Sequence, residues 1–112
     1  KGVDGVILPA GHVGVNAGEH GSHLYVIRID SKKTAMPRDR FRSVLKDTYK
    51  VETALHYPAV WDWDAFRNLG YTADGCPLAE RACKEVVSLP IFPATTEDDL
   101  RYIAYAIRET LK

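Results

Sequence analysis

The chain has 112 residues, of which 46% are hydrophobic and 27% are charged. This length and composition predict one soluble domain that is large enough to bury a core. The 15 basic and 15 acidic residues cancel to a net charge of zero, so neither a nucleic acid nor an anionic membrane surface is indicated as a partner. No apolar run in the sequence reaches the ~20 residues that a membrane span needs.

The two cysteines, Cys76 and Cys83, lie two helical turns apart, about 10 Å along a helix axis. That separation is too large for a disulfide, and the spacing matches no zinc motif. The first residues lack the apolar core of a signal peptide, so the sequence predicts a cytoplasmic protein with reduced thiols. The chain begins at Lys1 rather than Met, which we interpret as a processed chain or a piece of a longer protein.

Residues 1–22 contain six glycines and predict an irregular N-terminal segment or interdomain connector. Within it, residues 6–8 form a candidate short strand that ends at Pro9. Residues 23–30, HLYVIRID, are dense in β-branched and aromatic side chains and predict the clearest strand. A polar loop is expected at residues 31–33.

A helix is predicted from Pro37 to about Lys46, because proline suits the first helical position. Its buried stripe is expected at Phe41, Val44 and Leu45. Residues 50–57, KVETALHY, predict a second strand, which Pro58 would end. Residues 64–69 predict a short helix that stops at Gly70.

Pro77 is predicted to begin the next helix, and residues 87–89 to form a short strand closed by Pro90. Thr96 is the expected N-cap of the last helix, with three acidic residues in its first turn. The buried faces of these two helices are expected at Ala79, Ala82, Cys83 and Val86, and at Leu100, Ile103, Ala104, Ile107 and Leu111.

These elements predict the α+β class, with a small and mostly antiparallel sheet and helices packed on one of its faces. The strands are too few for a doubly wound sheet with a nucleotide-binding crevice.

His56, followed by Tyr57 and Pro58, is the strongest local candidate for a site residue. A histidine at a strand end can meet a ligand, and its ring can bond a hydroxyl or exchange a proton near neutral pH. The structural alternative is a partly buried strand histidine that bonds the backbone.

Other polar groups carry less chemistry. His12, His20 and His23 lie among glycines with only Glu19 nearby, so no metal site is predicted. Asp62 and Asp64 bracket Trp63, which suits either acid–base work or capping of the helix that follows. None of the seven lysines lies in an apolar stretch that would lower its pKa for Schiff-base chemistry.

Several short motifs occur together in one order. They are HLYVIR at residues 23–28, Arg38-Asp39, His56-Tyr57-Pro58, CPLAE at residues 76–80, SLPIFP at residues 88–93, and the last helix at residues 98–111. In this order and spacing, over roughly residues 5–112, the chain resembles the C-terminal small domain of a DegT/StrS-type sugar aminotransferase. The resemblance implies the C-terminal domain of the fold-type I transferase fold, with residues 23–112 as that domain.

The resemblance also implies an activity for the parent enzyme. Such enzymes use pyridoxal 5'-phosphate to transfer an amino group from glutamate or glutamine to a keto group on a nucleotide-linked sugar or a cyclitol. The cofactor lysine belongs to a large domain that this chain lacks, so the chain alone is expected to bind no cofactor and to be inactive. The implied partners are that large domain, the second subunit of a homodimer, and the keto-sugar or cyclitol substrate.

By the same resemblance, His56 would contact the sugar, and Tyr57 and His23 are weaker substrate-binding candidates. The family often has Pro-Leu-His after this motif, whereas this chain has Ala59-Val60-Trp61, which leaves the sugar undefined. Two alternatives remain open. One is a non-catalytic interaction or dimerisation module derived from this domain, and the other is part of a sugar dehydratase or aromatic-ring-forming relative that uses the same cofactor.

Overall fold

The computed structural model describes residues 2–9 and 23–112. Its sheet has three antiparallel strands in the order β1 (Val6–Ile7), β2 (Tyr25–Ile29) and β3 (Val86–Leu89). The helices are α1 (Ser31–Thr34), α2 (Arg38–Tyr49), the 3-10 turn η1 (Val60–Asp62), α3 (Asp64–Arg67), α4 (Pro77–Glu85) and α5 (Glu97–Thr110). The predicted α+β class and antiparallel sheet are confirmed. Over the described ranges, no helix combines the length and the apolar character needed to cross a bilayer.

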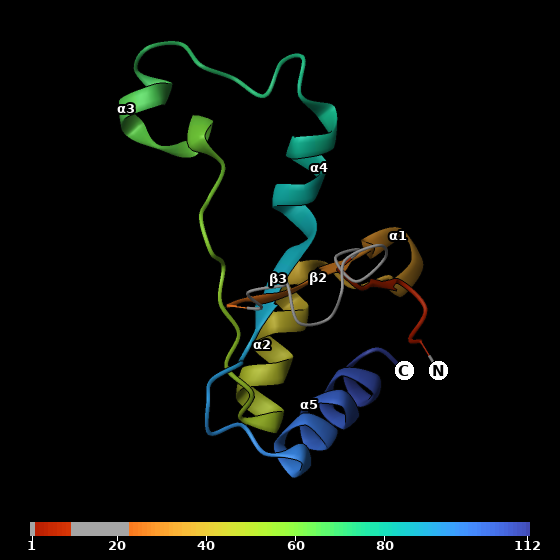
Figure 1. The fold of residues 1–112 in the computed structure, drawn as a ribbon. Coiled ribbons are helices and arrows are strands. Elements are labelled where there is room, and N and C mark those ends of the chain that lie inside the picture. Colours follow the sequence, from red (N-terminus) through yellow and green to blue (C-terminus); the bar gives the residue numbers. More distant parts are fainter. Residues whose placement is uncertain (1, 10–22) are drawn as a thin grey trace, which may run out of the picture.

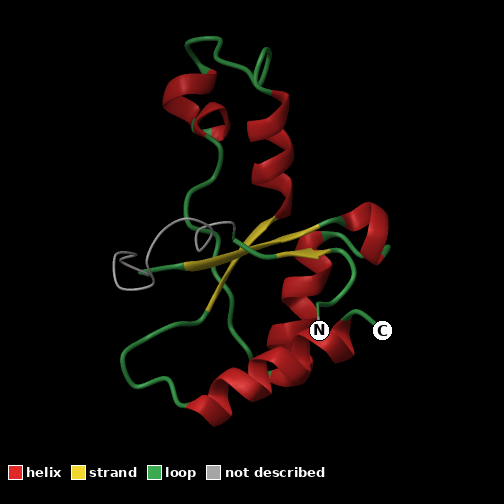
Figure 2. Ribbon diagram, turned by 45° about the vertical axis from the view of Figure 1, so that its right-hand side comes forward, coloured by secondary structure: helices red, strands yellow, loops and turns green. Residues whose placement is uncertain are grey.

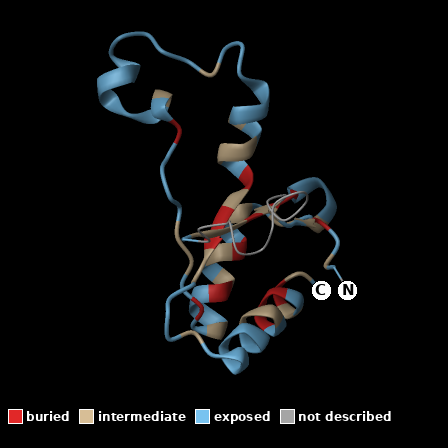
Figure 3. Cartoon of the chain, viewed as in Figure 1, coloured by how far each residue is buried: buried red, intermediate tan, exposed pale blue. Residues whose placement is uncertain are grey.

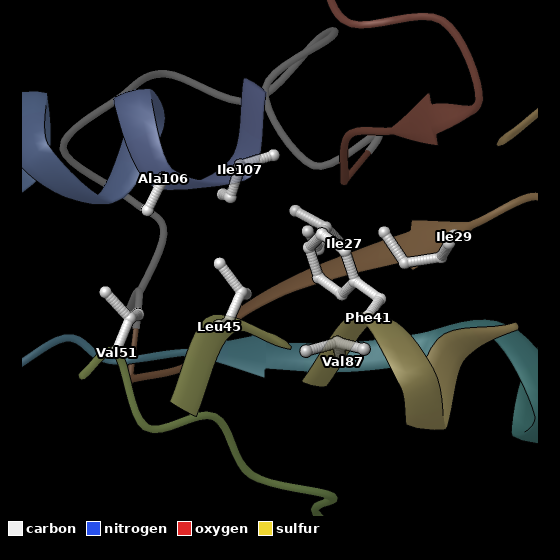
Figure 4. Packing of buried hydrophobic residues seen from close by; sticks show 8 residues of the cluster. All are labelled: Ile27, Ile29, Phe41, Leu45, Val51, Val87, Ala106 and Ile107. Carbon is white, nitrogen blue, oxygen red and sulfur yellow. The ribbon is translucent and has the colours of Figure 1, made fainter. Parts of the chain in front are cut away.

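The core lies between one face of the sheet and the helices α2 and α5 (Figure 1). Alternate residues of the central strand β2 point into it, and β2 pairs with both neighbours, Ile27 opposite Val87 and Ile29 opposite Val6. Figure 4 shows the buried cluster, which comprises Ile27, Ile29, Phe41, Leu45, Val51, Val87, Ala106 and Ile107. The predicted stripe of α2 is confirmed at Phe41 and Leu45, which are both fully buried, whereas Val44 is half-buried.

The N-cap of α5 is also confirmed. The Thr96 hydroxyl accepts a hydrogen bond from the Asp99 N–H at 3.1 Å, and the Asp99 carboxylate accepts one from the Thr96 N–H at 2.9 Å. The predicted core stripe of α5 is only partly right. Leu100 is 52% exposed, and Ala106 is buried instead, because the side of α5 that meets the end of α2 carries Ala106 and Tyr105, whose ring packs edge-on against that of Tyr49.

The strand predicted at residues 50–57 is wrong. A single bridge, between Ala54 and Ser88, is all that this segment adds to the sheet. Lys50 and Tyr57 have left-handed backbone angles (φ 56° and 74°), which bend the chain at both ends of the segment. The apolar pattern that suggested a strand arises partly from Val51, which is buried directly after α2.

The loop predicted at residues 31–33 is instead the short helix α1. Asp30 caps it, because its side chain accepts a hydrogen bond from the Lys32 N–H at 3.1 Å. Asp30, a capping residue at the end of an apolar strand, was the sequence feature that indicated this helix. The polar residues that follow it led to the prediction of a loop instead.

The buried face predicted for α4 is only partly formed. Ala79 is exposed, Ala82 and Cys83 are half-buried, and Val86 already belongs to β3. Helix α4 projects away from the sheet, so only its last turn reaches the core (Figure 1).

Residues 58–76 form an arm that connects the core to α4 and contains η1 and α3 (Figure 2). Most of the arm is exposed (Figure 3). A small aromatic cluster holds its tip together, with the Phe66 ring 6.4 Å from that of Trp63 and 5.8 Å from that of Tyr71.

A buried carboxylate joins the end of α4 to β2. Glu85 is 8% exposed and accepts hydrogen bonds from Arg28 Nη2 at 2.6 Å and from Arg81 Nε at 2.7 Å. Burial raises the pKa of Glu85, but the hydrogen bonds from Arg81 and Arg28 and their charges outweigh it, so the net pKa lies below the usual range. The ion pair therefore stabilises the fold when Glu85 is ionised.

We expect Glu85→Gln to lower the free energy of unfolding of the chain by about 1–2 kcal/mol at pH 7. Because the pKa of Glu85 is depressed in the folded state, its contribution is present above the unfolded pKa of about 4.3. It is lost as the pH falls through the folded pKa. Urea unfolding at neutral and at strongly acidic pH measures the difference, which we expect to shrink in acid.

Glu80→Gln is the matched control, because Glu80 pairs only with the exposed Lys84 one helical turn away. Its expected cost is about 0.5 kcal/mol or less. An equal loss of stability in the two variants, or a Glu85→Gln loss that is independent of pH, contradicts the argument.

Candidate functional site

The candidate site lies on the segment that leaves α2 and runs beside β3. Arg42 holds the start of this segment, since its Nε and Nη2 donate to the Oγ1 and the carbonyl of Thr53, both at 3.1 Å. Ala54 and Ser88 then exchange two backbone hydrogen bonds, at 3.0 and 2.9 Å. The chain is therefore fixed on two sides immediately before it reaches His56.

His56 is exposed, but one of its ring nitrogens is anchored. Nδ1 lies 2.7 Å from Oγ of Ser88, and Ser88 is only 4% exposed. The ring bonds a side chain rather than the backbone, and the residue lies outside any strand. Because Nδ1 already has a partner, Nε2 is the nitrogen left to meet a ligand.

Tyr57 turns the chain sharply out of this segment. Its φ of 74° lies in the left-handed region, which costs a residue with a Cβ about 1–2 kcal/mol. Its side chain is 78% exposed. Strained residues of this kind concentrate at functional sites. The backbone geometry of Tyr57 therefore points to the same segment, His56-Tyr57-Pro58, that the sequence singled out.

A cavity of about 280 Å³ lies beside Tyr57, between the start of α2, the end of α4 and the arm. Several charged side chains line it. Arg38 donates from Nη1 to the Cys83 carbonyl at 2.5 Å, and Lys84 pairs with Glu80 at 2.6 Å. Arg38 also donates from Nε to the Asp39 carboxylate at 2.9 Å, and this bond, with the charge of the guanidinium, holds the pKa of Asp39 below its usual range. Asp62 lines the same cavity, so its wall presents polar groups beside Tyr57.

The structure does not group His23 with His56. His23 is exposed and lies two residues before β2, and β2 reaches the level of Ser88 only at Val26. Three strand residues correspond to roughly 10 Å along the sheet. His12 and His20 lie outside the described residues. Within residues 2–9 and 23–112, no cluster of three histidine, cysteine or acidic side chains is arranged to hold a metal ion.

Sequence reasoning missed Ser88 as a site residue. It lies 32 positions after His56 in the sequence, and the pattern around it indicates only a strand. The contact depends on the register between β3 and the chain at Ala54, for which the sequence carries no local signal.

None of the described lysines lies in the environment that a pyridoxal-phosphate site requires for its lysine. Such a lysine needs a desolvated pocket or a neighbouring cation to lower its pKa. All the lysines of the described ranges are exposed, namely Lys32, Lys33, Lys46, Lys50, Lys84 and Lys112. In two of them the pKa is raised instead, since Lys46 and Lys112 donate hydrogen bonds to the carboxylates of Glu52 and Glu109.

The fold is one that aminotransferases contain. The chain superimposes on DesV of S. venezuelae, solved in complex with a ketimine intermediate, with a TM-score of 0.76 and 29% identity. The match covers 99% of this chain and 28% of the DesV chain.

The sequence comparisons agree. The profile of the DegT/DnrJ/EryC1/StrS aminotransferase family matches residues 1–108. Spore coat polysaccharide biosynthesis protein SpsC of Bacillus subtilis (strain 168) is 32% identical over 111 residues, which are 98% of this chain and 28% of SpsC. The dTDP-3-amino-3,4,6-trideoxy-alpha-D-glucose transaminase of Micromonospora megalomicea subsp. nigra is 30% identical over 108 residues, which are 96% of this chain and 26% of that enzyme.

This chain belongs to the DegT/DnrJ/EryC1/StrS aminotransferase family. It spans less than a third of the length of these relatives.

We expect glycine at position 57 to be more stabilising than alanine by about 1 kcal/mol, because only glycine adopts a positive φ without strain. Thermal or urea unfolding of Tyr57→Gly and Tyr57→Ala measures this difference. At Tyr102, an exposed position inside α5, the order reverses, and glycine is expected to be about 1 kcal/mol worse than alanine. The same order at both positions contradicts a strained Tyr57.

Proposed function

We propose that this chain is the C-terminal small domain of a pyridoxal-phosphate-dependent sugar aminotransferase. Residues 23–112 form the body of the domain, and residues 1–22 connect it to the rest of the protein while contributing the edge strand β1 to its sheet. The parent enzyme moves an amino group from glutamate or glutamine to the keto group of a nucleotide-linked sugar or a cyclitol, as a cytoplasmic homodimer. The observation that carries the proposal is the family match over residues 1–108, with an amino-sugar transaminase among the relatives.

The side chains of this domain indicate which functions it performs and which belong to the large domain. Its described lysines are all exposed, so the lysine that binds the cofactor belongs to the large domain. When bound there, the cofactor carries the amino group between donor and acceptor. This chain supplies His56 and Tyr57 on the substrate side. Their uncharged polar atoms match sugar hydroxyls, and His23 makes a more distant contact.

An apolar groove on the opposite part of the molecule supports a large-domain partner. The groove holds about 690 Å³ and is lined mainly by side chains of β1, β2, α5 and the chain after β3. Leu8, Ile91 and Leu100 line it and are 59%, 42% and 52% exposed. Exposed apolar surface of this kind marks an interface, and we infer that the large domain packs here.

The 112-residue chain is therefore expected to bind a hydrophobic dye such as ANS. The double variant Ile91→Ser/Leu100→Ser lowers the dye fluorescence, since it removes apolar area from the groove. Leu69→Ser/Leu78→Ser is the matched control, because these leucines are 74% and 82% exposed but lie outside the groove. A chain that binds no dye, or a control variant that loses as much signal, argues against the groove as the docking surface.

The activity itself is tested in the full-length protein that contains this chain. Glutamate or glutamine is supplied with a set of keto-sugars, and amino-sugar formation is measured. We expect His56→Gln to raise KM for the sugar about 3–10-fold, the effect of one lost hydrogen bond, and His23→Gln to change it about twofold or less.

The outcomes separate the alternatives. Cofactor absorbance without amino transfer favours a dehydratase or another lyase of the same family. A full-length protein with neither cofactor absorbance nor activity favours a non-catalytic module. An active enzyme whose sugar KM is unchanged by His56→Gln removes His56 from the site.

A further inference from the structure

We infer that Ser88 is a positioning residue for His56, which holds the imidazole so that Nε2 faces the substrate. The inference deepens the proposed function and rests on it for the role of His56. The contact between the two side chains stands independently, because it is a feature of this fold.

Ser88 is fixed by its neighbours on both edges of β3. It lies on β3, opposite Val26 of β2 on one side and Ala54 on the other. Both of its backbone groups are bonded to Ala54, at 3.0 and 2.9 Å, and the residue is 4% exposed. The Ser88 hydroxyl on such a backbone has little conformational freedom. The His56 ring, whose Nδ1 lies 2.7 Å from this hydroxyl, is therefore held in a defined position.

The pair lies on the face of the sheet opposite α2 and α5. Val87 points into the core beside Ile27 (Figure 4). Successive strand residues point to opposite faces, so Ser88 points away from that core, and His56 meets it there. The imidazole is therefore anchored on the side of the sheet that faces away from the core helices.

The hydrogen bond also gives the two ring nitrogens of His56 different roles. A neutral imidazole exchanges between two tautomers, and a fixed partner at one nitrogen favours one of them. With Nδ1 engaged by Ser88, Nε2 keeps a constant hydrogen-bonding role toward a sugar hydroxyl. The left-handed turn at Tyr57 follows directly, so the backbone of His56 is fixed at both ends. Ordering the ring before the substrate arrives lowers the entropy lost on binding.

The first test is kinetic and uses the full-length protein. Ser88→Ala is expected to raise KM for the sugar about 3–10-fold with little change in kcat. Ser88→Thr keeps the hydroxyl, suits a strand, and is expected to remain within about twofold of the parent. In a His56→Gln background the Ser88→Ala penalty disappears, because the two residues act through one contact. An undiminished penalty in that background overturns the inference.

The second test does not depend on activity. In the full-length protein with ¹⁵N-labelled histidine, His56→Gln assigns the ring signals of His56. Ser88→Ala is expected to shift them toward the values of a free imidazole, whereas Ser88→Thr leaves them in place. Ser43→Ala is the matched control, because it removes an exposed hydroxyl that bonds only its own helix, at the Asp39 carbonyl. Unchanged His56 signals in Ser88→Ala overturn the inference.

The two proposals fail separately. If His56→Gln leaves the sugar KM unchanged while Ser88→Ala shifts the ring signals, Ser88 positions His56 and the substrate role of His56 is wrong. If Ser88→Ala does not fold, Ser88→Cys replaces it, since a thiol keeps the volume but bonds weakly. The same shift of the His56 signals is then expected, and its absence counts against the positioning role.

Discussion

The hydrogen bonding of β3 on both of its edges is the constraint on which the rest of this structure depends. On one side, pairing with β2 places Val87 opposite Ile27 and closes the core under α2 and α5. On the other side, one bridge to Ala54 captures the chain that carries His56. Helix α4 leads directly into this strand, and its last residue, Glu85, ties it to Arg28 of β2. One four-residue strand thus connects the core, the ion pair and the candidate site.

Elements with a strong internal pattern could be predicted from the sequence. The apolar alternation of β2, the stripe of α2 and the capping sequence at Thr96 are each patterns that can be recognised within a few neighbouring residues. The strand prediction for residues 50–57 was wrong because Val51 is buried directly after α2 and only Ala54 pairs with the sheet, while Leu55 and Tyr57 are exposed. Two left-handed residues, which local propensity disfavours, decide its path.

The candidate site shows the same limit. His56 could be singled out because a histidine next to a tyrosine and a proline is conspicuous in the sequence itself. Its partner Ser88 could not, because the contact joins residues 32 positions apart and arises only after β3 has paired. The strain at Tyr57 could not be anticipated either, since nothing in the residue type indicates a positive φ. Local sequence therefore singled out the candidate side chain, and only the tertiary structure revealed what holds it.

The arm of residues 58–76 begins after the last bond that anchors His56. Residues 53–56, which carry the bonds to Arg42 and to Ser88, precede the arm in the chain. The aromatic contacts of the arm are made within the arm. The part that orders the histidine and the part that surrounds the neighbouring cavity are therefore mechanically separate. Such separation lets the arm vary in length and composition during divergence without moving the imidazole. Members of the family can in this way differ in the walls around the cavity while the histidine keeps its place.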